Sequence, residues 1–160
     1  MAALKAQEVD LFRSTGLHWL PVDPGWVLPL GDAGTMVLVP AGDERSGETQ
    51  TSHLQDLWHV YRAAKDRLPI RETAKPLSLE WARGVGDEIG RAYGGGVSRA
   101  GARWRSRPAS DPQRRLITKH RLAGRKEAAG LTKGEAADLL TVEFAGREMS
   151  RLIRRNRVAA

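Results

Sequence analysis

The residues best suited to chemistry form a basic stretch in the middle of the chain, "YGGGVSRAGARWRSRP" over residues 93–108. It contains four glycines, four arginines and one tryptophan, and no acidic residue. A guanidinium group is planar, stays charged and can give two parallel hydrogen bonds to a phosphate. This composition favours contact with a phosphate backbone, and the predicted contact residues are Arg99, Arg103, Trp104, Arg105 and Arg107.

Trp104 has two interpretations, to which we give equal weight. An aromatic ring inside a basic run can stack on an unpaired base, which stabilises a complex by ~1–3 kcal/mol. The same ring could instead anchor the stretch onto a folded core. For the stretch as a whole we predict two roles: a hinge at the three glycines 94–96, and a strand-gripping segment at 97–108 that orders when phosphate binds.

A second group of basic residues follows at helical spacing. At 100° per residue, the cations from Arg114 to Lys126 fall within about 160° of one helix face, and no acidic residue shares that face. Charged outer faces are common on amphipathic helices, but most of them mix signs. A last helix shows arginines opposite its apolar side. These two faces add Arg114, Arg115, Lys119, Arg121, Arg125, Lys126, Arg151, Arg154 and Arg155 to the predicted nucleic-acid-binding residues.

The residue types used for catalysis and metal binding lack the spacing that they need. His18, His53, His59 and His120 contain no i,i+3 or i,i+4 pair, and the chain has no cysteine to complete a metal site. No nucleophile lies near a base, and no phosphate-binding glycine motif is present. We therefore predict no catalytic residue, no metal and no cofactor, and a protein that is not an enzyme and has no small-molecule substrate.

The charge is distributed unevenly along the 160 residues. Residues 1–90 hold 9 Lys/Arg and 13 Asp/Glu, whereas residues 91–160 hold 17 Lys/Arg and 6 Asp/Glu. The net charge of +7 thus arises in the C-terminal part. A field of one sign attracts polyanions. This favours a nucleic-acid partner, with an acidic protein surface as the alternative.

The composition indicates a folded chain in a reducing compartment. Hydrophobic residues make up 41%, five residues are tryptophan and none is cysteine. No apolar run approaches the ~18 residues that span a bilayer, and the first residues lack the apolar core of a secretory signal. We therefore expect a cytoplasmic location and no membrane contact.

The first half of the chain combines helical patterns with one hairpin. Apolar spacing predicts a helix over residues 3–13, and "WVLPLGDAGTMVLVP" predicts a β-hairpin that pairs residues 26–30 with 35–39. Pro29 should place the first of these strands at a sheet edge. A helix over 52–68 is predicted from a capping box and a helical apolar face, and another over 78–93.

The second half is predicted to be helical throughout. "SDPQ" at 110–113 is a capping box that begins a helix, which should run to about Ala129, and the capping box "TKGE" begins a short helix over 132–141. A last helix should cover 143–155, with Met149, Leu152 and Ile153 facing inward. The predicted fold is therefore mainly α: a helical bundle with one small β-hairpin near the N-terminus and a C-terminal three-helix module. We divide it into a protein-contacting region at 1–93, a Gly/Arg-rich linker at 94–109 and a basic nucleic-acid-binding module at 110–160.

Residues 110–140 resemble a small helical module that is appended to DNA-handling proteins of actinobacteria and their phages. Gln113 and "GLTKGEA" at 130–136 carry the likeness, which covers about a fifth of the chain. The segment "RRLITKHRLAGRK" is more basic than is usual for that module. The resemblance implies a role in DNA handling.

In size, helical class and charge the chain is also similar to the small subunits of type IV-like CRISPR effector complexes, which serve antiviral defence. That resemblance implies contact with other protein subunits and with nucleic-acid strands. The hairpin is a departure, because those subunits are typically all helical.

Three functions follow from these observations. The first is a non-catalytic subunit of a ribonucleoprotein or DNA-processing assembly that grips single-stranded RNA or DNA without sequence specificity. The second is a phage or plasmid structural or regulatory protein whose basic half binds an acidic protein or duplex DNA. The third is a sequence-specific regulator, which the short helix at 132–141 makes a poor candidate because it has one base near its start.

Overall fold

The structure is a computed structural model that describes residues 11–13, 15–41, 57–64 and 67–159, with side chains up to residue 155. The predicted helix over 3–13 lies mostly outside the described residues, although residues 11–13 are helical. The strands are β1 (Leu20–Val22), β2 (Gly25–Pro29), β3 (Thr35–Pro40), β4 (Leu57–Ala63), β5 (Ile70–Arg71) and β6 (Leu77–Ser78). The α-helices are α2 (Leu79–Tyr93), α3 (Asp111–Lys119), α4 (Arg125–Gly130) and α5 (Lys133–Ala159), and the short 3-10 helices are η1 (Gly31–Ala33), η2 (Gly95–Val97) and η3 (Arg103–Ser106).

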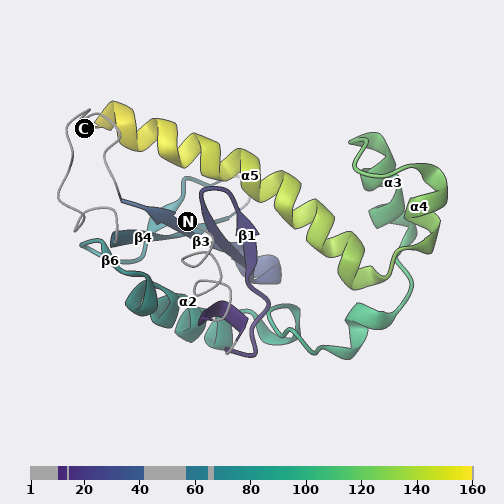
Figure 1. The fold of residues 1–160 in the computed structure, drawn as a ribbon, viewed down its shortest axis with the longest axis horizontal. Helices are drawn as coiled ribbons and strands as arrows, with labels where there is room; N and C mark the ends of the chain where they lie inside the picture. The colour runs from purple at the N-terminus through teal and green to yellow at the C-terminus, as the bar shows by residue number, and fades with distance from the viewer. Residues whose placement is uncertain (1–10, 14, 42–56, 65–66, 160) are drawn as a thin grey trace.

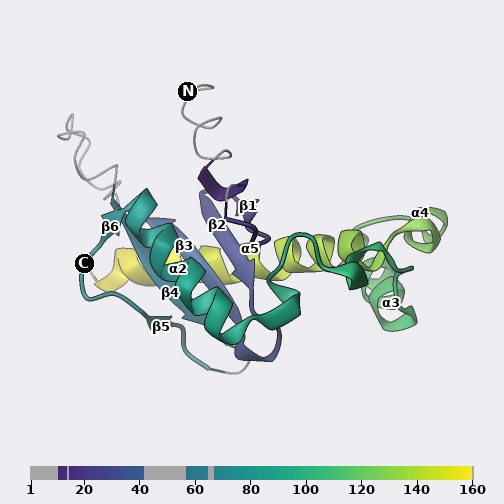
Figure 2. The ribbon, with the colours of Figure 1, turned by 90° about the horizontal axis from the view of Figure 1, so that it is seen from below.

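A six-stranded antiparallel sheet lies between two helices. Its order is β1-β2-β3-β4-β5, and β6 pairs with β4 beside β5. Helix α2 packs on one face of the sheet and the C-terminal half of α5 on the other (Figure 1). At 1.5 Å per residue, the 27 residues of α5 extend about 40 Å. Its N-terminal half therefore reaches beyond the sheet, where α3 and α4 lie (Figure 2).

The alternation of side chains along the strands builds two separate cores. Trp26, Leu28, Met36, Leu38 and Val60 point toward α2. Their neighbours on the same strands point toward α5, because successive side chains of a strand leave opposite faces. The second core consists of Val22, Val27, Val37, Val39, Tyr61 and Ala63 of the sheet with Ala145, Met149 and Leu152 of α5.

The prediction of a mainly α fold is wrong. The sheet has six strands instead of one hairpin, and it forms the middle layer of the molecule. The predicted hairpin itself is confirmed, with Trp26 opposite Leu38 and Pro29 opposite Thr35. Its strand β2 is not at the edge, however, because β1 pairs with residues 25–27. Proline is tolerated at position 29 because that position lies beyond the end of β1.

The helix predicted over 52–68 is a second error, because residues 57–63 form strand β4. Trp58 and Val60 belong to the core under α2, and Tyr61 and Ala63 belong to the core under α5. A strand that is buried on both faces reads as an almost continuous apolar run, which periodicity alone cannot distinguish from a buried helix. The proposed capping residues Ser52 and Gln55 lie outside the described residues.

The helix predicted from 110 to 129 is two helices, α3 and α4. Helix α3 ends in a Schellman motif: Leu122 N–H bonds to the Ile117 carbonyl at 2.9 Å, and Arg121 N–H bonds to the Thr118 carbonyl at 3.1 Å. Arg121 has φ 56° and occupies the left-handed position that glycine usually takes. Because the stop residue is arginine, the sequence carries no visible signal for the end of the helix.

The two helices predicted over 132–141 and 143–155 are one helix, α5. No Gly or Pro stop separates them, and Thr141 and Val142 lower helix propensity without ending a helix. The inward positions of Met149 and Leu152 are confirmed, since both side chains are buried against the sheet.

Helix α2 has the predicted bounds, with Ser78 as its N-cap. Part of its predicted inner face is exposed: Trp81 is 73% and Tyr93 62% accessible. The buried positions are smaller residues. A Cβ added at Gly86 would lie 2.6 Å from the Trp19 ring, and one at Gly90 would lie 2.6 Å from Leu28. These glycines let α2 approach the sheet closely.

Candidate nucleic-acid interface

The stretch at 94–108 is held against the folded chain at several points, whereas the sequence predicted a hinge and a mobile segment. Ser98 is fully buried, and its hydroxyl donates to the Pro29 carbonyl at 2.6 Å. Its own carbonyl accepts from His18 N–H at 2.7 Å. The next turn is tied by Ala100 N–H, which bonds to the Gly16 carbonyl at 3.1 Å. The stretch thus runs along the segment that precedes β1.

Trp104 connects η3 to η2 by a hydrogen bond. Its Nε1 donates to the Gly96 carbonyl at 2.9 Å, and the Arg105 guanidinium lies 5.2 Å from the centre of its ring. This contact lies within the stretch itself, so anchoring of Trp104 onto a folded core stays a prediction. Base stacking stays a prediction, because the ring is half-buried and not enclosed.

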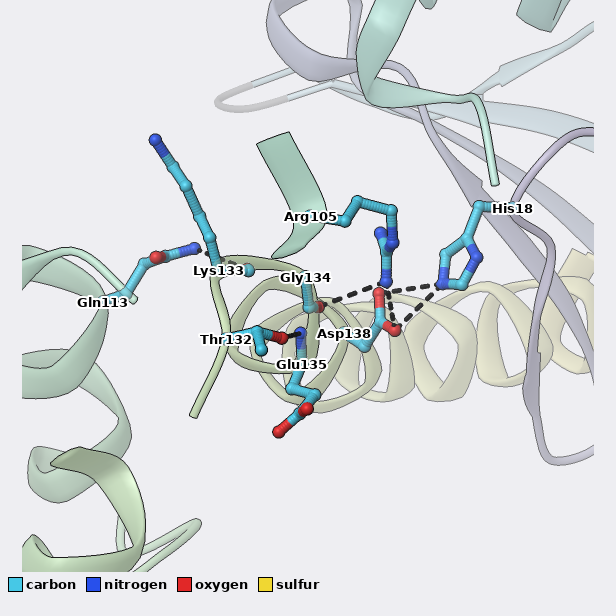
Figure 3. Close-up of polar contacts among 8 residues, drawn as sticks. All are labelled: His18, Arg105, Gln113, Thr132, Lys133, Gly134, Glu135 and Asp138. Carbon is cyan, nitrogen blue, oxygen red and sulfur yellow. Dashed lines mark hydrogen bonds and ion pairs between the residues drawn. The ribbon is translucent and has the colours of Figure 1, made fainter. Parts of the chain in front are cut away.

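A polar cluster joins three distant parts of the chain around Asp138 of α5 (Figure 3). Arg105 Nη2 donates to Asp138 Oδ2 at 2.6 Å and to the Gly134 carbonyl at 3.3 Å. From the other side, His18 Nε2 lies 2.9 Å from each Asp138 carboxylate oxygen. We call His18, Arg105 and Asp138 the junction cluster. It fixes η3 and the segment before β1 to the first turns of α5.

The junction cluster sets the charge state of its carboxylate. Burial raises the pKa of Asp138, but the hydrogen bonds from His18 and Arg105 together outweigh burial and hold that pKa below its ordinary value. Asp138 is therefore charged at neutral pH. Arg105 has a structural partner, and its side chain is only 15% exposed.

The beginning of α3 is tied to the beginning of α5. The predicted capping box is confirmed: Gln113 N–H bonds to Ser110 Oγ at 3.3 Å, and Ser110 N–H bonds to Gln113 Oε1 at 2.9 Å. Gln113 Nε2 then donates to the Lys133 carbonyl at 3.2 Å, while Lys133 N–H donates to the Arg107 carbonyl at 2.6 Å. The motif that carried the resemblance over 110–140 is thus capping chemistry that docks α3 on α5.

A small separate core supports this end of the molecule. Ile117 of α3 is fully buried together with Ala128 of α4 and Ala136 of α5. Three of its four buried residues are alanines, and Leu122, Leu131 and Leu140 pack against them partly buried, so it is smaller than the two cores of the sheet. It leaves the outer sides of α3 and α4 to solvent.

The positive charge concentrates on residues 91–131, which we call the basic segment. It holds eleven Lys/Arg residues and two Asp/Glu residues. In the described part of the chain, only Arg105 and Arg114 of these cations have an ion-pair partner, Asp138 and Asp111. The cations without one are Arg91, Arg99, Arg103, Arg107, Arg115, Lys119, Arg121, Arg125 and Lys126.

The predicted site residues outside the cleft described below separate into three groups, apart from Arg107, which is exposed just after η3. Arg105 and Arg114 make structural contacts, the second through a 2.7 Å bond to the Ala109 carbonyl. The remaining cations of α3, α4 and their connection are exposed at the end of the molecule that is remote from β6 (Figures 1 and 2). The three arginines of the last helix, Arg151, Arg154 and Arg155, lie near the other end of α5.

One cleft brings together cations that are distant in sequence. It has a volume of about 730 Å³ and lies between the C-terminal end of α2, the residues before β1 and the turn at 99–104. Arg91, Arg99, Arg103 and Trp104 line it, and none of its lining residues is acidic. Arg91 was not among the predicted site residues, because it lies in a helix that we assigned to protein contact. Its position in the last turn, shortly before the glycines, is the only signal in the sequence.

The histidines have structural surroundings where the structure describes them. His18 belongs to the junction cluster, His59 contacts Arg71, and His120 lies edge-to-face with Phe144. Burial, followed by the charge of Arg71, lowers the pKa of His59. His53 lies outside the described residues. Over those residues the structure contains no group of three His, Asp or Glu side chains placed to bind a metal, and no helix long and apolar enough to cross a membrane.

Comparison with known proteins gives one match. Residues 48–159 match the family model of the mitochondrial helicase Irc3, C-terminal domain. The chain belongs to this family. No curated protein and no solved structure matches it significantly.

The Irc3 C-terminal domain match extends from the residues before β4 to the end of α5, and so includes the whole basic segment. Strands β1–β3 lie outside the matched range, although β3 pairs with β4. Nothing in the comparisons points to a CRISPR small subunit. That resemblance rested partly on an all-helical outline, which the six-stranded sheet does not have.

Proposed function

We propose that this Irc3 C-terminal domain is a non-catalytic nucleic-acid-binding domain that serves a helicase-type, DNA-handling protein. Its basic segment contacts the phosphate backbone of DNA without reading base sequence. The observation that carries the proposal is the set of nine cations in the basic segment that have no ion-pair partner in the described part of the chain.

The contrast with the rest of the molecule supports this function. Elsewhere several arginines pair with acids, as in Arg62–Glu72 at 2.9 Å and Arg83–Asp87 at 3.5 Å. Like charges left unpaired side by side repel one another, and a polyanion removes that repulsion. The family name indicates a helicase, and the resemblance of residues 110–140 to modules of DNA-handling proteins favours DNA over RNA.

The test compares two charge-matched variants in a binding titration with fluorescent DNA. Reversal of three exposed cations in the basic segment should weaken binding by about 100-fold or more, because each removed phosphate contact also adds repulsion. Reversal of three exposed cations elsewhere should change binding less than about threefold. The first variant is Arg115→Glu, Lys119→Glu and Lys126→Glu, and the control is Arg13→Glu, Arg67→Glu and Lys75→Glu, whose cations are exposed and form no ion pair in the described part of the chain.

The salt dependence of binding provides a second readout. If about five phosphates are neutralised, log K should fall against log salt with a slope of about −3.5 on single strands and about −4.5 on duplex. Equal losses in the two variants, with an unchanged circular dichroism spectrum, would contradict a local interface. A slope near zero would indicate a protein partner instead, which stays our alternative prediction.

A further inference from the structure

We propose that the cleft lined by Arg91, Arg99, Arg103 and Trp104 is a subsite for one unpaired nucleotide of a bound strand. The arginines contact the phosphate and Trp104 stacks on the base. This inference rests on the proposed function and makes it specific: the exposed cations of α3 and α4 hold any phosphate backbone, whereas the cleft selects single-stranded DNA.

Three arginines reach this cleft from three different elements. Arg91 comes from the last turn of α2, Arg103 begins η3, and Arg99 lies in the turn between them. None of the three forms an ion pair within 4.0 Å in the described part of the chain, although Arg91 interacts electrostatically with Asp87, one turn before it in α2. No acidic side chain lines the cleft. A concave site with one sign of charge concentrates the field and attracts an anion.

The backbone that carries these arginines is held in place before any ligand binds. Arg99 forms an antiparallel bridge with Leu17, and Ala100 N–H bonds to the Gly16 carbonyl at 3.1 Å. Several neighbouring carbonyls already accept hydrogen bonds, including Gly16 and Gly96. The cleft therefore presents cationic side chains on a backbone that is already ordered, so little backbone entropy is lost when a ligand binds.

Trp104 adds a stacking surface to the same cleft. Its Nε1–H is bonded to the Gly96 carbonyl, so the orientation of the ring is fixed. The ring contacts Arg105, which is bonded to α5, and also lines the cleft. Stacking on an aromatic ring requires a base that is out of a duplex. A volume of about 730 Å³ lies within the range of small-molecule sites.

The experiment measures the affinity of the full chain for a 12-nucleotide oligo(dT) and for a hairpin duplex with the same number of phosphates. The Arg91→Gln variant is the decisive one, because Arg91 is exposed on α2 and outside the stretch that looks basic in the sequence. We expect about a tenfold loss on oligo(dT), the effect of one charge-assisted hydrogen bond, and less than about a threefold loss on the duplex. Lys75→Gln is the charge-matched control and should leave both affinities unchanged.

Variants of Trp104 separate stacking from anchoring. Trp104→Phe removes the hydrogen bond to Gly96 and keeps a ring, so it should retain most of the preference for oligo(dT). Trp104→Leu removes the ring and should lose that preference by about tenfold. Equal behaviour of the two variants, with the fold intact by circular dichroism, would overturn the stacking role.

Failure of this inference differs from failure of the proposed function. If the wild-type chain binds neither DNA, the proposed function is wrong. If the triple variant of α3 and α4 loses binding while Arg91→Gln reduces oligo(dT) and duplex binding equally, only the subsite is wrong. Thymidine 5′-monophosphate tests the source of the phosphate: binding as tight as that of the 12-mer would show that the cleft takes free nucleotides and would overturn its assignment to a strand.

Discussion

Arginines have different surroundings in the two regions of this molecule. In the body, which comprises the sheet, α2 and the C-terminal half of α5, several of them lie beside acids: Arg62 beside Glu72, Arg83 beside Asp87 and Arg151 beside Glu148. Arg71, Arg154 and Arg155 form no ion pair in the described part of the chain. In the basic segment most of them have no acidic partner in the described part of the chain. Residue type alone therefore does not indicate a binding role.

The regions also differ in how much apolar surface supports them. The body has two cores that contain tryptophans, leucines and valines, whereas the core under α3 and α4 is built around Ile117 and alanines. Burial of apolar surface is the main stabilising term of a fold. The end of the molecule with the most unpaired charge thus has the least core to hold it. The junction cluster ties η3, which precedes α3, to α5 and to the segment before β1.

The largest expected effect comes from truncating Ile117, the large side chain of this small core that is fully buried. Ile117→Ala should lower the free energy of unfolding of the α3–α4 end by about 2–5 kcal/mol, because it deletes fully buried methyl groups and leaves a cavity. Hydrogen exchange should show α3 and α4 opening while β2, β3 and β4 stay protected. Equal loss of protection in the sheet would show that the two regions unfold as one unit.

Two glycines of α2 test how closely the body is packed. Gly86→Ala should destabilise the protein by about 1–3 kcal/mol, because the new Cβ would lie 2.6 Å from the buried Trp19 ring. Gly84→Ala, in the same helix with nothing within 4 Å, should instead stabilise it by up to about 1 kcal/mol. Chemical denaturation measures both. DNA binding should be unchanged in either variant, and a loss in Gly84→Ala would mean that α2 takes part beyond Arg91.

Local signals in the sequence predicted local structure well. The hairpin register and the bounds of α2 follow from turn residues, propensities and capping residues that lie within or next to these elements in the sequence. The Ser110–Gln113 capping box is local in the same way. Strand β4 could not be predicted like this, because its identity depends on pairing with β3 and on burial beneath two helices. Nor could the end of α3, where Arg121 adopts a conformation that glycine usually signals.

The candidate site shows the same limit. The arginine-rich stretch was visible as a phosphate-binding pattern. Sequence proximity could not show which of its arginines form ion pairs or hydrogen bonds within the fold. Arg105 pairs with Asp138, which lies 33 positions away, and Arg91 joins the cleft from a helix assigned to the other region. The separation into a region at 1–93, a linker at 94–109 and a module at 110–160 stays a prediction.

The smallest expected effect concerns the junction cluster that connects the two regions. Asp138→Asn should cost about 1–2 kcal/mol near pH 7, because the amide keeps a hydrogen-bond acceptor for Arg105 but loses the charge. The folded pKa of Asp138 lies below its ordinary value of 3.8, so the stabilisation by its carboxylate is present above that value and is lost as the pH falls through the folded pKa. Urea denaturation of wild type and variant should therefore differ at neutral pH and converge as the pH falls below the folded pKa of Asp138. A difference that persisted in acid would show that the amide disturbs packing around Gly134, and that the charge of Asp138 is not what joins the basic segment to the body.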